Sequence, residues 1–347
     1  MLTRDFYFDL PEELIAQFPT EHRGDERLLV LDRNDGSYSD MLMHDFPSLL
    51  TPGSLLVVNN SKVRKARLYA TSGSGGNVEF LFLYPYPDGS WAVMTKRARK
   101  QKVGKSYKFF SKDGDVALSG TITKENEDGT KVFAPDDSIS EELFDKIGHV
   151  PLPPYIKRED LFSDETRYQT VYAKKEGSVA SPTAGLHFTP EILDEIRKRG
   201  IDVAEVTLHV GSGTFLPVRS ERIEDHRKHT ESYEVPDDVA RKINEAKKSG
   251  RKIVAVGTTS MRTIESASGD DGMVRSGRSS TNIFIYPGYR FKVVDELLTN
   301  FHTPESTLLM LVSAFAGKEN IMNAYHHAIG ERYRFFSYGD AMYIRLK

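Results

Sequence analysis

Three histidines stand where the sequence could use them for acid–base chemistry. His187 follows the small residues at the start of "GSVASPTAGLHFTPE". His209 lies near the end of the strand-like run "VTLHV", and His302 precedes the apolar segment "STLLMLVSAF". An imidazole changes its protonation near neutral pH and can donate or accept a proton during a reaction. Each histidine could equally be a hydrogen-bonded structural residue, so their types alone leave both interpretations open.

Small and polar loops follow two of the strand-like runs. "VTLHVGSGTF" leads into Gly211 and Gly213, and "IVAVGTTSMR" leads into Thr258 and Thr259 before a predicted helix. Ligands of α/β proteins bind beyond the carboxyl ends of strands, where glycine allows a close approach and helix N-termini favour anions. One such loop is weak evidence, but two of them together with "SVASPTAG" predict a single small-molecule pocket.

The sequence offers few residues for cysteine chemistry, for metal binding or for the common hydrolase and nucleotide-binding motifs. The chain has no cysteine, which excludes disulfides, thiolate metal ligands and a cysteine nucleophile. His226 and His229 in "DHRKHTE" could share a helical face, but no further ligands accompany them and we expect no metal site. The nucleophile-elbow serine, Walker and dinucleotide patterns are absent.

The elements that must position these residues fall into two types. Residues from about 65 to 148 form short β-prone runs separated by turns, such as "NVEFLFLY", "WAVMTKR" and "DVALSGTIT". Elsewhere, capped helices such as "TPEILDEIRKRG" and "PDDVARKINEAKKSG" alternate with the strands "ERLLVLDR", "GSLLVVNN", "RKIVAVG" and "TNIFIY". We predict an α/β fold in which a discontinuous domain of residues 1–62 and 150–347 is interrupted by a small antiparallel β-barrel domain of residues 63–149.

Charge is locally concentrated although the chain is nearly neutral. The formal net charge of −3 does not indicate a nucleic-acid-binding protein, but "SKVRKAR" and "KRARKQKVGK" carry ten basic residues between them. Such runs are either solvated surface or phosphate contacts. No signal peptide or membrane-length apolar run is present, so we expect a cytoplasmic protein that does not bind membranes, and a monomer.

A series of long motifs covers essentially the whole chain. In chain order it includes "LPEELIAQFP", "LLVVNNSKV", "VPLPPYI", "TRYQTVYA", "GSVASPTAGLHFT", "VTLHVGSGTFLPV", "VGTTSMR", "TNFHTPESTLLMLVSAF" and "YRFFSYGDAM". The series closely resembles the S-adenosylmethionine:tRNA ribosyltransferase-isomerase family of queuosine biosynthesis. The family usually has other residues at Arg64, Lys65, Ser181, Lys228 and Thr303.

The resemblance implies an α/β domain with an inserted barrel and an unusual use of S-adenosylmethionine. The ribosyl group is transferred to 7-aminomethyl-7-deazaguanine at the tRNA wobble position and isomerised, giving epoxyqueuosine, while adenine and methionine leave. A base must remove a proton from the carbon next to the positive sulfur, and an acid must assist the departure of adenine. No metal and no cofactor beyond S-adenosylmethionine is expected.

The resemblance also implies roles for particular residues, each of which could instead support a loop. The acid–base candidates are His187, His209, His302 and Glu231. Arg262 could bind the methionine carboxylate or a tRNA phosphate, Thr258 and Thr259 the ribose hydroxyls, and Asp340 the modified base. The remaining expected substrate contacts, from the small-residue loops, are Ser178, Thr183, Gly185, Gly211 and Gly213.

The tRNA is expected to contact the basic segments of the predicted barrel and its entry. The residues concerned are Arg64, Lys65, Arg67, Lys96, Arg97, Arg99 and Lys100. Tyr155, Tyr168 and Tyr172 could stack on an unpaired base or could belong to the core.

Two other functions remain open at this stage. An S-adenosylmethionine-dependent RNA methyltransferase would release S-adenosylhomocysteine in place of adenine and methionine. An RNA-binding module without activity would bind tRNA regardless of S-adenosylmethionine and of the wobble base.

Overall fold

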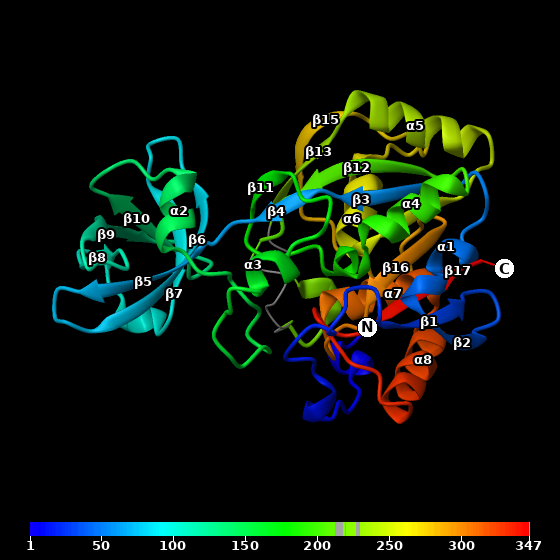
Figure 1. Ribbon diagram of the computed structural model, residues 1–347, viewed down its shortest axis with the longest axis horizontal. Coiled ribbons are helices and arrows are strands. Elements are labelled where there is room, and N and C mark those ends of the chain that lie inside the picture. The colour runs from blue at the N-terminus through cyan, green and yellow to red at the C-terminus, as the bar shows by residue number, and fades with distance from the viewer. Residues whose placement is uncertain (212–217, 219, 227–229, 347) are drawn as a thin grey trace.

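The computed structural model describes residues 1–211, 218, 220–226 and 230–346. Its largest element is a nine-stranded sheet with the strand order β15-β13-β12-β3-β14-β16-β17-β1-β2 (Figure 1). The strands are β1 (Arg27–Asp32), β2 (Tyr38–Leu42), β3 (Leu55–Asn59), β12 (Asp202–Leu208), β13 (Glu231–Val235), β14 (Ile253–Val256), β15 (Gly277–Thr281), β16 (Glu296–Asn300) and β17 (Ala341–Arg345).

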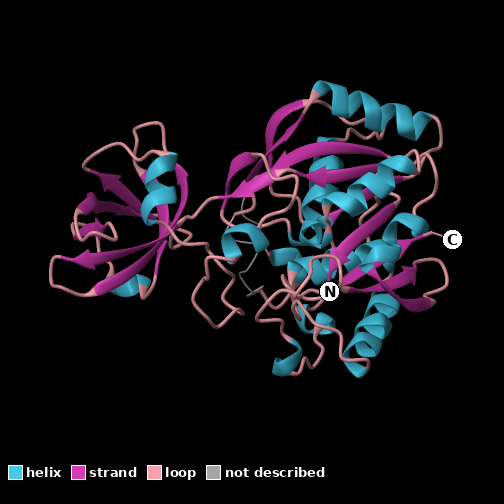
Figure 2. Cartoon of the chain, viewed as in Figure 1, coloured by secondary structure: helices cyan, strands magenta, loops and turns pink. Residues whose placement is uncertain are grey.

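The sheet is covered on both faces, as its uninterrupted hydrophobic strands require. In β3, Leu55 and Val57 belong to one core cluster, whereas Leu56 and Val58 belong to a second one on the opposite face. Figure 2 shows the helices on either side of the strands. The predicted α/β fold class is confirmed. The helices of this part of the chain are α1 (Phe46–Leu49), α3 (Asp164–Arg167), α4 (Pro190–Lys198), α5 (Asp237–Lys248), α6 (Gly257–Ala267), α7 (Thr307–Ala316) and α8 (Lys318–Gly330).

Local sequence signals predict the start of α4 correctly, but they fail at "TNIFIY". The hydroxyl of Thr189 accepts a hydrogen bond from the N–H of Ile192, 3.2 Å away, so α4 begins where its cap predicts. The strand predicted for "TNIFIY" is wrong, because β15 ends at Thr281. The Thr281 hydroxyl accepts the N–H of Ile283 at 3.0 Å, and the chain leaves the sheet there.

Strand direction decides which residues meet at the sheet edge where the parallel strands end. β12, β3, β14 and β16 are parallel neighbours, so their carboxyl ends lie together. β17 is antiparallel to β16, and β1 is parallel to β17. The residues that precede β17 and β1 therefore reach this same edge, although they come from opposite ends of the chain.

Residues Arg67–Pro135 contain a closed antiparallel barrel with the strand order β10-β7-β6-β5-β8-β9. Its interior is aromatic: the ring centroids of Phe82 and Phe133 are 5.7 Å apart, and Phe144 of α2 (Glu141–Ile147) lies 5.6 Å from Phe82. The predicted inserted barrel is thus confirmed, whereas the domain limits at residues 62/63 and 149/150 stay a prediction. The barrel strands are β5 (Arg67–Ser72), β6 (Asn77–Pro85), β7 (Trp91–Thr95), β8 (Ser106–Phe110), β9 (Val116–Glu125) and β10 (Lys131–Pro135).

Two chain segments join the barrel to the rest of the molecule (Figure 1). The N–H of His149 donates to the carbonyl of Arg67 at 2.8 Å, and a Cβ on Gly148 would lie 2.1 Å from the carbonyl oxygen of Lys65. Next to this connection, β4 (Ser61–Val63) pairs with β11 (Lys175–Ser178). Within the described part of the chain, no helix has the length and apolar character needed to cross a membrane.

Candidate active site

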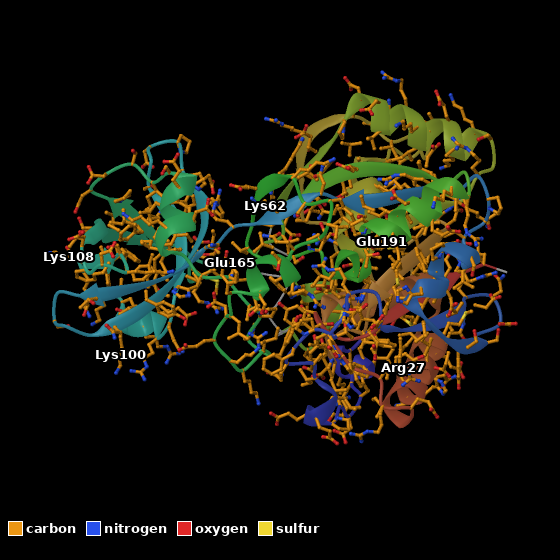
Figure 3. The ribbon with its side chains drawn as sticks, in the orientation of Figure 1. Arg27, Lys62, Lys100, Lys108, Glu165 and Glu191 are labelled. Carbon is orange, nitrogen blue, oxygen red and sulfur yellow. The ribbon has the colours of Figure 1, made fainter. Side chains whose placement is uncertain are left out.

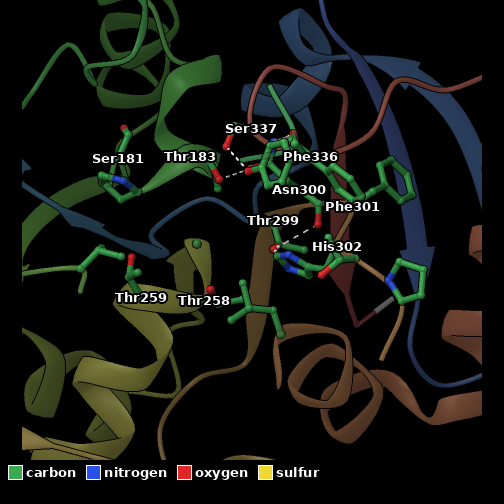
Figure 4. Close-up of a pocket in the computed structure, with 18 residues that line it drawn as sticks. Ser181, Thr183, Thr258, Thr259, Thr299, Asn300, Phe301, His302, Phe336 and Ser337 are labelled. Atoms are coloured by element: carbon green, nitrogen blue, oxygen red, sulfur yellow. Dashed lines mark hydrogen bonds between the residues drawn. The ribbon is translucent and has the colours of Figure 1, made fainter. Parts of the chain in front are cut away.

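A cavity of about 220 Å³ lies at the sheet edge where β14 and β16 end (Figure 4). Most of its lining comes from four segments: the "SPTA" loop that leads into the short helix η5 (Thr183–His187), the start of α6, the end of β16 with the residues after it, and the residues before β17. The side chains that line it include Tyr155, Ser181, Thr183, Thr258, Thr259, Thr299, Asn300, His302, Thr303, Phe336 and Ser337. The predicted convergence of the "SVASPTAG" and "VGTTSMR" loops is therefore observed.

His302 is the one acid–base candidate among the described residues that lines this cavity. Its Nε2 lies 2.9 Å from the hydroxyl of Thr299, and its backbone N–H donates to the Tyr325 hydroxyl at 2.9 Å. Burial lowers the pKa of His302 to about 3, because a charged ring would lose its hydration. The imidazole is therefore neutral near pH 7.

His187 lies behind the cavity wall and is 1% exposed. Its Nε2 is 3.1 Å from Nδ2 of Asn300, and the same amide nitrogen donates to the carbonyl of Phe336 at 3.1 Å. The amide oxygen of Asn300 accepts the hydroxyl of Thr183 at 3.0 Å. Since the amide nitrogen can only donate, Nε2 of His187 must accept, and the ring hydrogen is on Nδ1.

The second ring nitrogen of His187 faces a buried carboxylate. Nδ1 is 3.6 Å from Oε2 of Glu26, which also accepts the N–H of Gly24 at 2.9 Å. Burial raises the pKa of Glu26, but the neighbouring His187 ring and the hydrogen bond from the Thr20 hydroxyl outweigh burial and lower that pKa to about 2. Glu26, His187 and Asn300 therefore form a connected chain that ends at the cavity wall.

That wall contains a strained residue. Phe336 has a φ of 71°, a left-handed conformation that is rare for a bulky side chain. Next to it, the hydroxyl of Ser337 lies 2.5 Å from that of Tyr155. Strain of this kind persists only where the surroundings determine the conformation, here through Asn300 and Tyr155.

The other two acid–base candidates lie outside the cavity. The imidazole of His209 packs against Gly177, where an added Cβ would lie 2.9 Å from Nδ1. Burial and then the charges of Arg64 and Lys175 lower the pKa of His209. Glu231 accepts the N–H of Gly211 at 3.1 Å, and one of its oxygens lies 2.5 Å from Nη2 of the buried Arg262.

Several predicted substrate contacts are also away from the cavity and bind other protein groups. The hydroxyl of Ser178 accepts the N–H of Val210 at 3.0 Å. Asp340 accepts the N–H groups of Arg27 and Arg334 at 2.9 and 2.7 Å, and burial raises its pKa. Gly185 faces Tyr172, and Gly213 lies outside the described residues. Thr183, Thr258 and Thr259 do line the cavity.

The basic residues predicted to contact tRNA divide into two groups. Arg64 is paired with Glu141, and its guanidinium carbon lies 5.2 and 5.1 Å from the ring centroids of Trp91 and Phe144. Lys65 and Arg67 pair with Glu165 and Glu79 at 2.8 and 3.1 Å. The second group lies at the surface of the barrel, where Figure 3 labels Lys100, and comprises Lys96, Arg97, Arg99 and Lys100.

The remaining candidates from the sequence are three tyrosines and two histidines. Tyr168 and Tyr172 are buried, whereas Tyr155 lines the cavity. His226 packs against Phe284 with ring centroids 5.3 Å apart, and His229 lies outside the described residues. In the ranges that the structure describes, no group of three His, Cys, Asp or Glu side chains could hold a metal ion.

Four residues of the site were missed by reasoning from the sequence: Glu26, Asn300, Phe336 and Ser337. Asn300 could have been predicted from the sequence, because a polar residue at the end of a buried strand indicates a site at the sheet edge. Glu26 carried none, since its relation to His187 depends on strand order. The strain at Phe336 is a backbone property that the residue type does not reveal.

Comparisons with known proteins agree with this architecture. Residues 3–344 match the family model described as "Queuosine biosynthesis protein". The S-adenosylmethionine:tRNA ribosyltransferase-isomerases of Treponema denticola and Clostridioides difficile are 55% and 49% identical to this chain, covering 99% of it and 100% of each relative. A crystal structure of the S-adenosylmethionine tRNA ribosyltransferase of Thermotoga maritima is 37% identical, covers 98% of this chain and 99% of its own, and has a TM-score of 0.55. The chain belongs to the queuosine biosynthesis protein family.

Proposed function

We propose that this chain is an S-adenosylmethionine:tRNA ribosyltransferase-isomerase. It transfers the ribosyl group of S-adenosylmethionine to 7-aminomethyl-7-deazaguanine at the tRNA wobble position and isomerises it to epoxyqueuosine, releasing adenine and methionine. The observation that carries this function is the 55% identity to a protein of that name over the full length of both chains. The cavity adds support, since hydroxyl, amide and aromatic groups suit a nucleoside and exclude water from its intermediates.

His302 is the proposed proton acceptor for the carbon next to the sulfonium. Its lowered pKa reflects the cost of adding a net positive charge to a buried ring. S-adenosylmethionine itself brings that charge into the cavity. Moving a proton from its 5′ carbon to the imidazole leaves the net charge unchanged, so burial opposes this transfer less than it opposes protonation by water.

His187 is proposed to position the cavity wall, without exchanging protons with the substrate. Asn300 lies between its imidazole and the cavity, and the Asn300 N–H determines that the ring hydrogen is on Nδ1, the nitrogen that faces Glu26. With that tautomer, Nε2 holds the Asn300 amide, and the amide in turn holds the carbonyl of Phe336. Glu231, Arg262, Asp340 and Ser178 are proposed to support the surrounding loops.

The tRNA is proposed to contact the basic residues at the barrel surface. In the cavity, Thr258, Thr183 and Ser337 are proposed to contact the reacting groups. Lys96, Arg97, Arg99 and Lys100 are accessible to a phosphate backbone, in contrast to Arg64 with its aromatic and acidic neighbours. A cytoplasmic monomer that needs no cofactor beyond S-adenosylmethionine completes the proposal.

A product assay tests the reaction. The purified protein is mixed with S-adenosylmethionine and tRNA carrying 7-aminomethyl-7-deazaguanine, and adenine is followed by chromatography. We expect adenine to appear in step with an added ribosyl-derived mass on the tRNA. S-adenosylhomocysteine as the product would show a methyltransferase, and bound tRNA with neither product would show a binding module.

A further inference from the structure

We infer that the N-terminus of α6 is an anion site that holds the carboxylate of the methionine half of S-adenosylmethionine, an inference that rests on the proposed function. α6 begins in the cavity wall with Gly257, Thr258 and Thr259. Its cap residue is Val256, whose side chain makes no capping hydrogen bond. The first backbone N–H groups of such a helix have no partner within it and carry a partial positive charge.

Two buried hydroxyls that line this cavity have no hydrogen-bond partner among the described residues. Thr259 is 8% exposed and Ser181 is 5% exposed; both line the cavity, and the hydroxyl oxygen of each is unpartnered. The Thr259 oxygen lies 3.5 Å from the point that a Cβ on Gly257 would occupy, so it sits over the first turn of α6. Buried hydroxyls normally find a partner within the protein, and two unpartnered ones in one cavity, one of them on the first turn of α6, indicate a ligand that accepts hydrogen bonds.

The surrounding charges identify the kind of ligand group. Among the described residues, the cavity is lined by no lysine, arginine, aspartate or glutamate. Arg262 lies farther along α6 and is held by Glu231, at 2.5 Å between Nη2 and Oε2. The helix end is therefore the positive pole of the cavity. Helix amides only donate, so a carboxylate suits them better than a ribose hydroxyl, which must also place its own hydrogen.

The same chemistry would accept a tRNA phosphate, so the test must separate the two sources. S-adenosylmethionine and decarboxylated S-adenosylmethionine, which lacks only the carboxylate, are titrated calorimetrically into the wild type and into Thr259→Val, Thr259→Ser and Thr303→Val. Valine has the shape of threonine without the hydroxyl, and Thr259→Ser restores the hydroxyl. Thr303 lines the same cavity from another segment and serves as the matched control.

The wild type should bind S-adenosylmethionine about tenfold or more tightly than the decarboxylated compound, as expected for hydrogen bonds to a charged group. Thr259→Val should weaken binding of S-adenosylmethionine by about tenfold and leave the decarboxylated compound unchanged. Thr259→Ser should recover most of the loss, and Thr303→Val should keep the wild-type ratio of the two affinities.

Three results would overturn the assignment. Equal weakening of both compounds by Thr259→Val would mean that the hydroxyl binds the nucleoside. Unchanged binding of both, with a raised KM for tRNA, would identify a phosphate as the anion. A wild type that does not distinguish the two compounds would show that the carboxylate lies elsewhere. A wild type that shows the expected selectivity but releases no adenine would disprove the proposed reaction while leaving this site intact.

Discussion

His187 and Asn300 form the link between the buried acid–base chain and the cavity. Nε2 of His187 accepts the side-chain N–H of Asn300 at 3.1 Å, so this nitrogen is turned to the protein and not to the cavity. With Glu26 on the other side, this histidine is placed to hold the Asn300 amide and not to donate a proton to a substrate. A positioning role and a proton-transfer role predict different behaviour of the same substitutions.

We expect His187→Gln to retain more activity than His187→Ala, because a glutamine oxygen can still accept the Asn300 N–H. His187→Ala should lower kcat/KM by about 10- to 100-fold, the effect typical of an outer positioning residue. Steady-state adenine release measures both variants. If His187 transfers protons itself, the glutamine variant should be as inactive as alanine and the pH profile of kcat should lose one limb.

His302→Asn should abolish most of the reaction while leaving binding of S-adenosylmethionine in place. Loss of a general base typically lowers the rate by about 10²- to 10⁴-fold. Single-turnover adenine release gives the rate, and calorimetry gives the affinity. His209→Asn is the control, because His209 lies outside the cavity and should stay within about threefold of the wild type; an equal loss in both variants would contradict the assignment.

Stability should fall as the pH is lowered from 7 to 5, and His302 should account for part of the change. Its pKa is about 3 in the fold and 6.5 when unperturbed, so the unfolded chain binds a proton below pH 6.5 that the folded chain excludes. The free energy of unfolding then decreases by about 1.4 kcal/mol per pH unit below pH 6.5. Urea titrations at pH 7 and 5 should show a decrease about 2 kcal/mol smaller in His302→Asn than in the wild type. Equal decreases would mean that the ring is not buried as a neutral group.

Gly185→Ala should destabilise the protein because the new methyl group has no space. A Cβ at this position would lie 2.2 Å from the hydroxyl oxygen of Tyr172 and 2.7 Å from Cγ2 of Thr170. Overpacking of this kind costs about 1–3 kcal/mol, which thermal melting can detect. Tyr172→Phe should relieve part of the destabilisation in the double variant. Gly73→Ala, where a Cβ meets nothing within 4 Å, should melt as the wild type does.

Replacing the surface basic residues Lys96, Arg97 and Lys100 with alanine should weaken tRNA binding and its dependence on salt. For every phosphate that the variant no longer binds, the slope of log K against log salt should decrease by about 0.7 to 0.9. A charge-matched variant of the same barrel, Lys108, Lys112 and Lys124 to alanine, separates local contacts from net charge. Identical slopes for the two triple variants would argue against a specific contact at the first set.

The sequence predicted the elements well because their signals are local. The cap at Thr189 and the continuous hydrophobic run of β3 depend only on neighbouring residues. The strand prediction at "TNIFIY" is wrong because its isoleucine and aromatic residues lie beyond the end of β15 and pack against the core on one face of the sheet, where Ile285 is buried. Hydrophobic burial was predicted correctly there, but strand pairing was not, because pairing requires a partner.

Contacts between side chains that are distant in sequence could not be predicted from local sequence signals. Arg64 belongs to a basic run, yet Trp91, Phe144 and Glu141 surround it, and each of them comes from a segment distant in sequence. Glu26 meets His187 only because β1 lies beside β17 and β17 beside β16. The "SVASPTAG" and "VGTTSMR" loops did converge as predicted, the latter because the carboxyl ends of parallel strands meet at one edge.

The antiparallel placement of β17 beside β16 has a consequence for synthesis. Glu26, His187, Asn300 and Ser337 span almost the whole chain, and the last of them precedes the final strand. A nascent chain whose residues from Phe336 onward have not yet left the ribosome lacks both the strand that separates β16 from β1 and the Phe336–Ser337 wall. A chain that lacks β17 and the residues just before it therefore cannot assemble the cavity, so the cavity depends on this segment having folded into place.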